Sequence, residues 1–367
     1  MFIQRLSLSN FRNYSNLTIE FNSNINVIYG NNAQGKTNII ESIFLCSMGK
    51  SFRISKDTEL IKFDQNKASV EMVFFKDERN HNIKVDIDNK KSFLYNGIKQ
   101  NKVSDIIGKI NTIIFTPDDI NIIKDGPSKR RRFLDMMISS LRPNYLHILN
   151  KYNKVIEQRN NYLKQIANQG NNMQLLDTLD EQAAFYSGEI YKYRFEFYEK
   201  LKECIKDFHK MITNSGNLKV DEEIKIHYLS NGKDKESYLD GLSKNRKIDI
   251  ERGYTSIGVH RDDLLIFVNG KLVSDFGSQG QQRTVTLALK LCELKIVKDE
   301  IGDYPILLLD DFMSELDENR RKSFLESISN CQIILTCTDD LDLKGNVSKY
   351  YVENGSIKLE NVTRKKG

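Results

Sequence analysis

The segment 30–37 reads GNNAQGKT, which is a complete phosphate-binding loop of the form G-x-x-x-x-G-K-[ST]. An apolar run at 25–29 precedes the loop and predicts a β-strand, and residues 37–48 after it predict an α-helix. A strand, a glycine-rich loop and a helix in this order form the context that the motif needs to bind phosphate. The sequence therefore predicts an α/β fold that binds ATP or GTP.

Each part of the loop has an expected role at the nucleotide. Backbone N–H groups and the N-terminus of the following helix surround the phosphates. Lys36 is expected to reach the β- and γ-phosphates and to take part in catalysis, and the Thr37 hydroxyl is expected to hold Mg²⁺. The residues that we expect to contact the nucleotide here are Gly30, Asn31, Asn32, Ala33, Gln34, Gly35, Lys36 and Thr37.

A second part of the nucleotide site is expected at 306–311, where the apolar run ILLL ends in two acids. A buried strand that ends in an acid supplies the carboxylate that positions Mg²⁺ beside a phosphate loop, and Asp310 occupies that place. Asp311 follows, where a carboxylate can orient and deprotonate the attacking water, which makes it the expected catalytic base. A simple helix cap after a buried strand is the alternative reading of the two acids.

The segment 277–283, GSQGQQR, comes before a predicted helix at 284–297. Ser278 is a natural N-cap and Gln281 stands three residues later, as in a capping box. Ser278, Gly280 and Gln281 also form a second expected phosphate site, at a helix N-terminus. Because the chain already has its own phosphate loop, we expect this site to contact the γ-phosphate bound by a partner subunit. An ATP-dependent homodimer follows from that expectation.

The chain is expected to consist of a nucleotide-binding domain interrupted by a helical arm. Residues 1–127 and 216–367 carry the motifs and strand-rich patterns, whereas 128–215 has helical periodicity. Apolar residues recur there at spacings of three and four, with Arg159 filling one gap, and a turn is expected at 168–172. Two antiparallel helices are the simplest interpretation, with Pro143 separating a shorter helix before them.

Composition limits the cellular setting that we expect. Of the 367 residues, 39% are hydrophobic, and no apolar stretch reaches the 18 residues of a membrane helix. The five cysteines are scattered and odd in number, which argues against disulfides and a zinc site and favours a reducing cytoplasm. A net charge of +5 is compatible with a polyanionic partner without requiring one.

Eight short blocks, in order, resemble the RecF family of bacterial DNA replication and repair proteins, within the ABC-type ATPases. The 314–317 loop after the acids fits the same class. The blocks are LSLSNFRNY at 6–14, QGKTN at 34–38, GKSFR at 49–53, FTPDD at 115–119, RRRFLD at 130–135, HRDDL at 260–264, GSQGQQR at 277–283 and DDF at 310–312. One departure is Val259, where the family usually has proline. A second, common to the family, is that the expected strand 333–335 runs into TCTD at 336–339 and not into the histidine that many ABC ATPases have there. The group that senses the γ-phosphate is left open by the second departure.

This resemblance implies an ABC-type P-loop ATPase head of mixed sheets and helices, lobe I, with an inserted α-helical arm, lobe II. It also implies ATP and Mg²⁺ as cofactors, ATP-dependent dimerisation and slow hydrolysis. DNA binding at gaps, cooperation with RecO and RecR in loading RecA onto single strands, and a part in SOS induction are implied in the same way.

Basic residues suggest where DNA could bind. The run Lys129, Arg130, Arg131 and Arg132 opens the helical region, and Lys50 and Arg53 follow the helix of the phosphate loop. Such cations can neutralise phosphates of single-stranded, gapped or duplex DNA without reading its sequence. A solvated or acid-paired helix start is an equally good interpretation of the run.

Two other functions share some of these features. The ATPase subunit of a membrane transporter would contain the same motifs but would not need the arm. A small-molecule kinase would contain the phosphate loop, although the 277–283 segment argues against it, because a kinase supplies its own γ-phosphate contacts.

Overall fold

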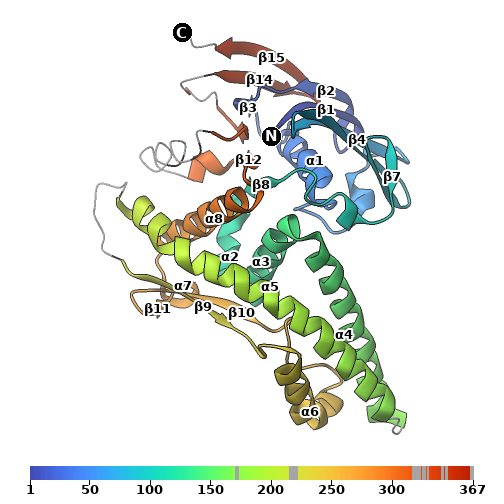
Figure 1. Cartoon of the computed structure of the whole chain (residues 1–367). Coiled ribbons are helices and arrows are strands. Elements are labelled where there is room, and N and C mark those ends of the chain that lie inside the picture. Colours follow the sequence, from blue (N-terminus) through green and yellow to red (C-terminus); the bar gives the residue numbers. More distant parts are fainter. Residues whose placement is uncertain are drawn as a thin grey trace. The chain divides into compact units, whose positions relative to one another are not determined.

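The computed structural model describes residues 1–169, 173–214, 222–315, 324, 328, 330–339, 343 and 346–363 (Figure 1). The chain divides into two compact units. The first contains residues 1–119 and the described part of 293–367, and the second contains 120–214 and the described part of 218–292. Each unit is therefore built from segments that are distant in the sequence.

The first unit contains a six-stranded, largely parallel sheet in the order β15-β14-β3-β13-β12-β8. Only the β14–β15 pair is antiparallel. The strands are β3 (Ile25–Tyr29), β8 (Thr112–Phe115), β12 (Ile306–Asp310), β13 (Ile333–Cys337), β14 (Val347–Glu353) and β15 (Ser356–Thr363). All five residues of β12 and of β13 are buried, as expected of central parallel strands.

A second, antiparallel sheet of the first unit has the order β2-β1-β4-β5-β6-β7. Its strands are β1 (Phe2–Phe11), β2 (Tyr14–Glu20), β4 (Ala68–Lys76), β5 (Arg79–Ile87), β6 (Lys91–Tyr95) and β7 (Ile98–Gln100). Buried residues alternate along β4, so one face of the sheet packs inward. Asn96 and Gly97 have positive φ angles and form the β6–β7 hairpin turn, which is the usual place of an Asn-Gly pair between two strands.

Helix α1 (Lys36–Met48) follows the phosphate loop directly and contains mostly buried residues. It ends at Gly49, whose φ of 66° is left-handed and whose N–H bonds back to Leu45 O. The predicted strand, loop and helix at 25–48 are therefore present in the expected order.

The second unit is built around two long helices, α4 (Pro143–Gln169) and α5 (Met173–Asn214), which pack along each other (Figure 1). The separate helix expected before Pro143 is α3 (Pro127–Leu141), which follows α2 (Asn121–Lys124). Residues 170–172 of the predicted turn lie outside the described residues. Helix α6 (Lys235–Arg252) packs on α4 and α5 and was not predicted.

A three-stranded sheet, in the order β11-β10-β9, completes the second unit. It consists of β9 (Ile224–Leu229), β10 (Asp263–Val268) and β11 (Lys271–Leu272), and Asn269 and Gly270, both with positive φ angles, form the β10–β11 turn. A short helix, α7 (Val273–Phe276), then leads to α8 (Gln279–Ile301). Packing thus groups the described part of 218–292 with the helices, whereas the predicted boundaries grouped 216–367 by its motifs.

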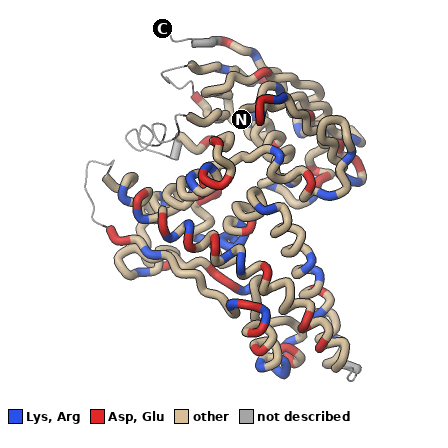
Figure 2. The backbone as a smooth tube through the Cα atoms, viewed as in Figure 1, with Lys and Arg blue, Asp and Glu red and all other residues tan. Residues whose placement is uncertain are grey.

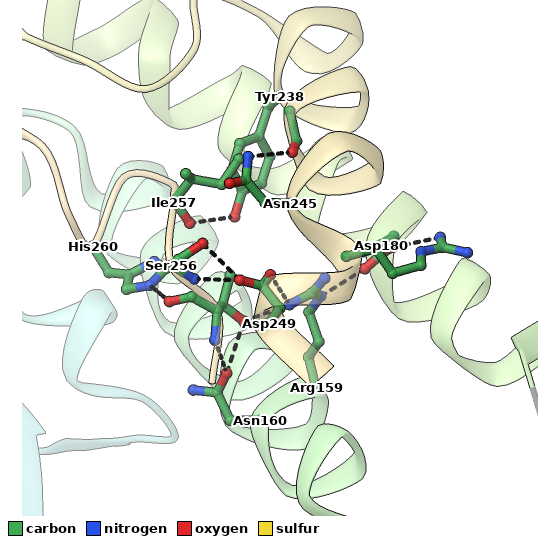
Figure 3. A network of polar contacts seen from close by, with 12 residues as sticks. Arg159, Asn160, Asp180, Tyr238, Asn245, Asp249, Ser256, Ile257 and His260 are labelled. Atoms are coloured by element: carbon green, nitrogen blue, oxygen red, sulfur yellow. Dashed lines mark hydrogen bonds and ion pairs between the residues drawn. The ribbon is translucent and has the colours of Figure 1, made fainter. Parts of the chain in front are cut away.

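Arg159 is the centre of a buried ion network in the second unit (Figure 3). Its Nε lies 2.6 Å from Asp180 Oδ1, its Nη1 lies 2.8 Å from Asp249 Oδ2, and all three side chains are at most 1% exposed. Asp249 also accepts hydrogen bonds from the N–H and hydroxyl of Ser256. Because these residues come from α4, α5, α6 and the loop after α6, the network fixes the packing of all four segments.

Candidate nucleotide-binding site

Two glycines of the phosphate loop occupy positions that a side chain could not. Gly30 has a φ of 144°, and a Cβ there would lie 2.4 Å from Val352 O. Gly35 has a φ of 107°, and a Cβ there would lie 2.5 Å from the Asn13 side chain. Ala33 between them also has a positive φ, of 64°. The loop therefore holds a strained backbone, which is common at functional sites.

Neighbouring turns hold the loop through its carbonyl and side-chain oxygens. Asn13 Nδ2 donates to Gln34 O at 2.9 Å, and the Tyr14 hydroxyl donates to Gly35 O at 3.1 Å. The Asn354 N–H donates to Gln34 Oε1 at 2.7 Å. None of these three bonds uses an N–H group of the loop, so they leave the phosphate-binding donors unengaged.

The Lys36 ammonium lies across the loop, within reach of bound phosphates. Its Nζ donates to Gly30 O at 2.6 Å and to Asn31 O at 2.8 Å. Burial lowers the pKa of Lys36, while the charges of Asp311 and Asp310 act in the opposite direction. The ammonium is thus a partly desolvated cation, which attracts an anion such as a triphosphate, whereas the two acids would need a cation between them and the phosphates.

Asp310 is held by two hydroxyl groups, one from each side. The Thr37 and Thr336 hydroxyls both donate to Asp310 Oδ1 at 2.8 Å. Burial raises the pKa of Asp310, and the two hydrogen bonds oppose that effect. Thr336 was not predicted as a site residue, although a polar residue in the apolar strand β13 could have indicated it.

The donor set around Asp310 fits magnesium. A carboxylate and a hydroxyl are the hard oxygen ligands that Mg²⁺ prefers, and Mg²⁺ at nucleotides usually takes one or two carboxylates and fills its other positions with water and phosphate oxygens. Among the described residues no cluster of three or more His, Cys, Asp or Glu could hold a metal on its own. The Thr37 hydroxyl and the Asp310 carboxylate are two hard oxygen ligands that lie 2.8 Å apart.

Asp311 begins the turn after β12 with an unusual backbone. Its φ is 50°, and its N–H donates to Thr336 Oγ1 at 3.0 Å. The same Thr336 hydroxyl donates to Asp310, so one threonine fixes both acids. Leu316 and Asp317 of the loop that follows lie outside the described residues.

The predicted capping box at the start of α8 is present. The Ser278 N–H donates to Gln281 Oε1 at 2.9 Å, and the Gln281 N–H donates to Ser278 Oγ at 3.2 Å. A Cβ on Gly280 would meet only Ser278 Oγ, at 3.9 Å, so the surface of this turn is open. We call residues 277–283 the signature segment.

Arg130 is not available to DNA, contrary to the sequence-based expectation. Its Nε and Nη2 donate to the two carboxylate oxygens of Asp263 at 2.6 and 2.9 Å, and it is 7% exposed. Arg131 is half-buried and donates to Asp262 O. Lys129 is exposed and lies 3.8 Å from Asp125, and Arg132 is exposed. In the run 129–132, Arg130 and Arg131 therefore bond within the protein, whereas Lys129 and Arg132 lie at the surface.

Arg53 lies beside the helix of the phosphate loop. Its Nη1 donates to Asn38 Oδ1 at 3.0 Å and lies 3.8 Å from the buried Glu41 carboxylate, and its charge opposes the rise that burial causes in the pKa of Asp310. Lys50, the other predicted DNA contact in this region, is exposed. Arg53 therefore belongs electrostatically to the nucleotide site.

Glu41 is a supporting residue that sequence analysis missed. It is fully buried in α1 and accepts two hydrogen bonds from the Arg12 guanidinium, at 2.9 and 2.8 Å, and one from the Ser51 hydroxyl. An acid inside the apolar run 37–48 could have indicated such a buried partner.

The chain is similar to proteins of DNA repair over almost its whole length. The RecF/RecN/SMC N-terminal domain family matches residues 2–356. The DNA replication and repair protein RecF of Clostridium perfringens (strain 13 / Type A) is 44% identical over 363 residues, which are 97% of each chain. That of Clostridium tetani is 43% identical over 375 residues, covering 98% of this chain and all of the relative.

Solved structures also show similarity to proteins of this family. The recombination mediator protein RecF with ATP, described as part of the RecFOR pathway, superposes with a TM-score of 0.91 at 37% identity and 98% coverage of both chains. An SMC head bound to a domain of ScpA has a TM-score of 0.59 at 16% identity, covering 100% of this chain and 99% of that one, which shows a shared fold. The predicted ABC-type ATPase head of mixed sheets and helices is confirmed.

Proposed function

This chain belongs to the RecF family, and we propose that it is an ATP-binding protein of DNA replication and repair that acts in a RecFOR pathway. The observation that carries this proposal is the arrangement of Lys36, Thr37 and Asp310. The three side chains place an ammonium, a hydroxyl and a carboxylate around a loop whose glycines accept close contact. That set is what a nucleoside triphosphate with Mg²⁺ requires.

Bound ATP would be held mainly by charge and backbone donors. Lys36 would exchange its bonds to Gly30 O and Asn31 O for phosphate oxygens. Thr37 and Asp310 would hold Mg²⁺, which neutralises charge on the phosphates. The Thr336 hydroxyl keeps the Asp310 carboxylate in one orientation, so little rearrangement is needed on binding.

Asp311 is our candidate for the general base. Its left-handed backbone and the bond from its N–H to Thr336 fix the start of its side chain next to Asp310. There its carboxylate can accept a proton from a water that attacks the γ-phosphate. Hydrolysis would be slow and would serve to reset a switch.

ATP would act by joining two copies of the chain. Ser278, Gly280 and Gln281 of each copy would contact the γ-phosphate held by Lys36 of the other. Head-to-tail contacts of this kind give two equivalent sites about a two-fold axis. The capping box supports this, because Ser278 Oγ accepts a bond from the Gln281 N–H and keeps its hydroxyl hydrogen for a phosphate oxygen.

DNA would be bound through its backbone, as single-stranded, gapped or duplex DNA. The surface residues that remain candidates for DNA contacts are Lys129, Arg132 and Lys50. Arg130 is no longer a candidate, because its side chain is buried. Figure 2 shows basic and acidic residues interspersed along α5, so the arm helix does not present one sign of charge. RecR and RecO would be protein partners of the chain. Loading of RecA and induction of the SOS response would follow from their joint action. The chain would act in the cytoplasm.

The transporter alternative is not favoured. The relatives that match nearly the full chain are DNA repair proteins. Among the helices that the structure describes, none has the length and apolar composition of a membrane span.

A gel-shift experiment with single-stranded, duplex and gapped DNA tests the proposal. ATP should strengthen binding to at least one of these DNAs, and the Lys36→Met variant should show no ATP effect. Binding should weaken steeply with salt, because phosphate contacts release counterions. A chain that binds none of the three DNAs at low salt, with or without ATP, would rule out the proposed function.

A further inference from the structure

The side chain of Gln281 connects the signature segment to a residue outside it. Its Oε1 accepts from the Ser278 N–H at 2.9 Å, which closes the cap of α8. Its Nε2 donates to Glu222 Oε1 at 2.8 Å, across 59 positions of sequence. A capping box needs only the first of these bonds. The second bond therefore has no role in capping the helix.

Glu222 determines which way the Gln281 amide faces. A carboxylate only accepts hydrogen bonds, so the amide nitrogen must point toward Glu222 and the amide oxygen toward the Ser278 N–H. The fixed amide holds the Ser278 backbone through its N–H, and the backbone N–H of Gln281 donates to Ser278 Oγ at 3.2 Å. The Ser278 hydroxyl hydrogen is then directed away from the cap.

His209, near the end of α5, lies close to the second carboxylate oxygen of Glu222, Oε2. Its side chain is 1% exposed, and its Nε2 lies 3.5 Å from Glu222 Oε2 without forming a hydrogen bond. Burial lowers the pKa of His209, so the imidazole is neutral at pH 7. The Glu222 side chain is only 10% exposed, and a hydrogen bond in such a low-dielectric place is stronger than one in water.

We propose that Glu222 is a positioning residue for the signature segment. Through Gln281 it orients the Ser278 hydroxyl for a γ-phosphate bound by a second copy of this chain. Glu222 itself touches no nucleotide, and its contact with His209 extends the connection to the arm helix α5. The inference rests on the proposed function, because it requires that ATP of a partner copy reaches Ser278.

Sedimentation of Glu222→Ala with a non-hydrolysable ATP analogue is the main experiment. The dimer dissociation constant should rise at least about tenfold, the size expected for one lost hydrogen bond to a charged group. Affinity of the monomer for a fluorescent ATP analogue should be unchanged, since the phosphate loop is intact. Glu222→Gln keeps an acceptor oxygen and should recover part of the loss.

Glu223→Gln is the matched control, because it removes the same charge one residue away. Glu223 is exposed and pairs with Lys225 at 2.8 Å. This variant should dimerise like the parent chain. A further comparison uses Gln281→Leu: if Glu222 acts through Gln281, adding Glu222→Ala to that variant should weaken dimerisation no further.

Hydrogen exchange of the monomer separates positioning from general stability. The Ser278 amide, which donates to Gln281, should exchange faster in Glu222→Ala, while amides in the centre of α8 keep their protection. Dimerisation of Glu222→Ala equal to that of the parent, or additive effects with Gln281→Leu, would overturn the inference and leave the proposed function standing. A parent chain that stays monomeric with the analogue would instead overturn the ATP-gated dimer, and the inference with it.

Discussion

Thr37 and Asp310 are hydrogen-bonded, with Thr37 Oγ1 donating to Asp310 Oδ1 at 2.8 Å across 273 positions of sequence. Thr37 lies in the first turn of α1, and Asp310 is the last residue of β12. The bond joins the hydroxyl and the carboxylate that together suit Mg²⁺. The fold therefore brings together two groups of the candidate nucleotide site that are far apart in the sequence.

Lys36→Met is expected to weaken ATP binding by about 10–100-fold, the range for losing charge-assisted hydrogen bonds to an anion. The fold should persist, because methionine keeps the apolar stem and the two lost bonds go to loop carbonyls. Equilibrium binding of a fluorescent ATP analogue measures the effect, with thermal unfolding as the control. An unchanged affinity for the ATP analogue would show that this loop does not bind the nucleotide.

Asp311→Asn should bind ATP like the parent but hydrolyse it about 10²–10⁴ times more slowly, as expected for loss of a general base. Asparagine tolerates the left-handed backbone at this position, so the turn after β12 should survive. Single-turnover hydrolysis with excess enzyme gives the rate. Should the variant keep the parental rate, the base must be sought elsewhere.

The motifs of the site could be predicted from sequence because each one is formed by residues that are close together in the chain. The loop at 30–37, the acids at 310 and 311, and the capping box at 278–281 each depend on spacings of a few residues. Strand and turn patterns such as Asn96-Gly97 are local in the same way. The predicted local structure of these segments agrees with the structure for that reason, while the roles of their residues at a nucleotide stay predictions.

Buried charges could not be predicted, because their partners are far away in sequence. Arg130 looked like one of four surface cations, but its partner Asp263 is 133 positions away. Arg159 interrupted an apolar pattern, and nothing local indicated Asp249, 90 positions away. Helix α6 was missed since only three of its residues, Tyr238, Leu242 and Asp249, are buried, too few for a periodic pattern.

Arg159→Met should destabilise the second unit by about 3–5 kcal/mol, the usual result of removing one partner from a buried ion pair. Methionine fills part of the space, but Asp249 would be left as a buried carboxylate without a cation. Urea unfolding measures the change. Lys192→Met, which breaks an exposed pair with Glu189, is the control and should leave the stability almost unchanged.

His260 should make the second unit sensitive to acid. Burial lowers the pKa of His260 to about 4 from 6.5. Because the folded pKa is below the unfolded value, the stabilisation is present above pH 6.5 and is lost as the pH falls toward 4. About 2 kcal/mol should be lost between pH 7 and pH 5.

The neutral imidazole is fixed by its partners, which is why protonation is unfavourable. Nε2 must carry the hydrogen to reach Thr255 O, and Nδ1 then accepts from the Tyr152 hydroxyl at 2.8 Å. Urea unfolding at pH 7 and pH 5 compares the parent with His260→Asn, whose stability should depend less on pH. Equal pH dependence of the two chains would contradict the assignment.

Ser278→Arg should prevent ATP-dependent dimerisation without removing ATP affinity. Arginine puts bulk and charge where the γ-phosphate of a partner copy would lie, and it leaves the phosphate loop of its own chain unchanged. If ATP binds the dimer more tightly than the monomer, linkage requires ATP to favour the dimer by the same factor. ATP affinity of the monomer should therefore stay near the parental value while the gain from dimerisation disappears.

Sedimentation with and without ATP, with hydrolysis blocked by Asp311→Asn, separates the possible causes. The Ser278→Ala variant is a useful companion, because it removes the hydroxyl without adding bulk and should weaken the dimer less than arginine does. Both variants lose the Ser278 side-chain cap, which costs about 1 kcal/mol of helix stability, so a simple capping role would affect them equally. A graded loss, with arginine far worse than alanine, is expected only if Ser278 faces another molecule. A parent chain that remains monomeric at saturating ATP and micromolar concentration would reduce the signature segment to a helix cap.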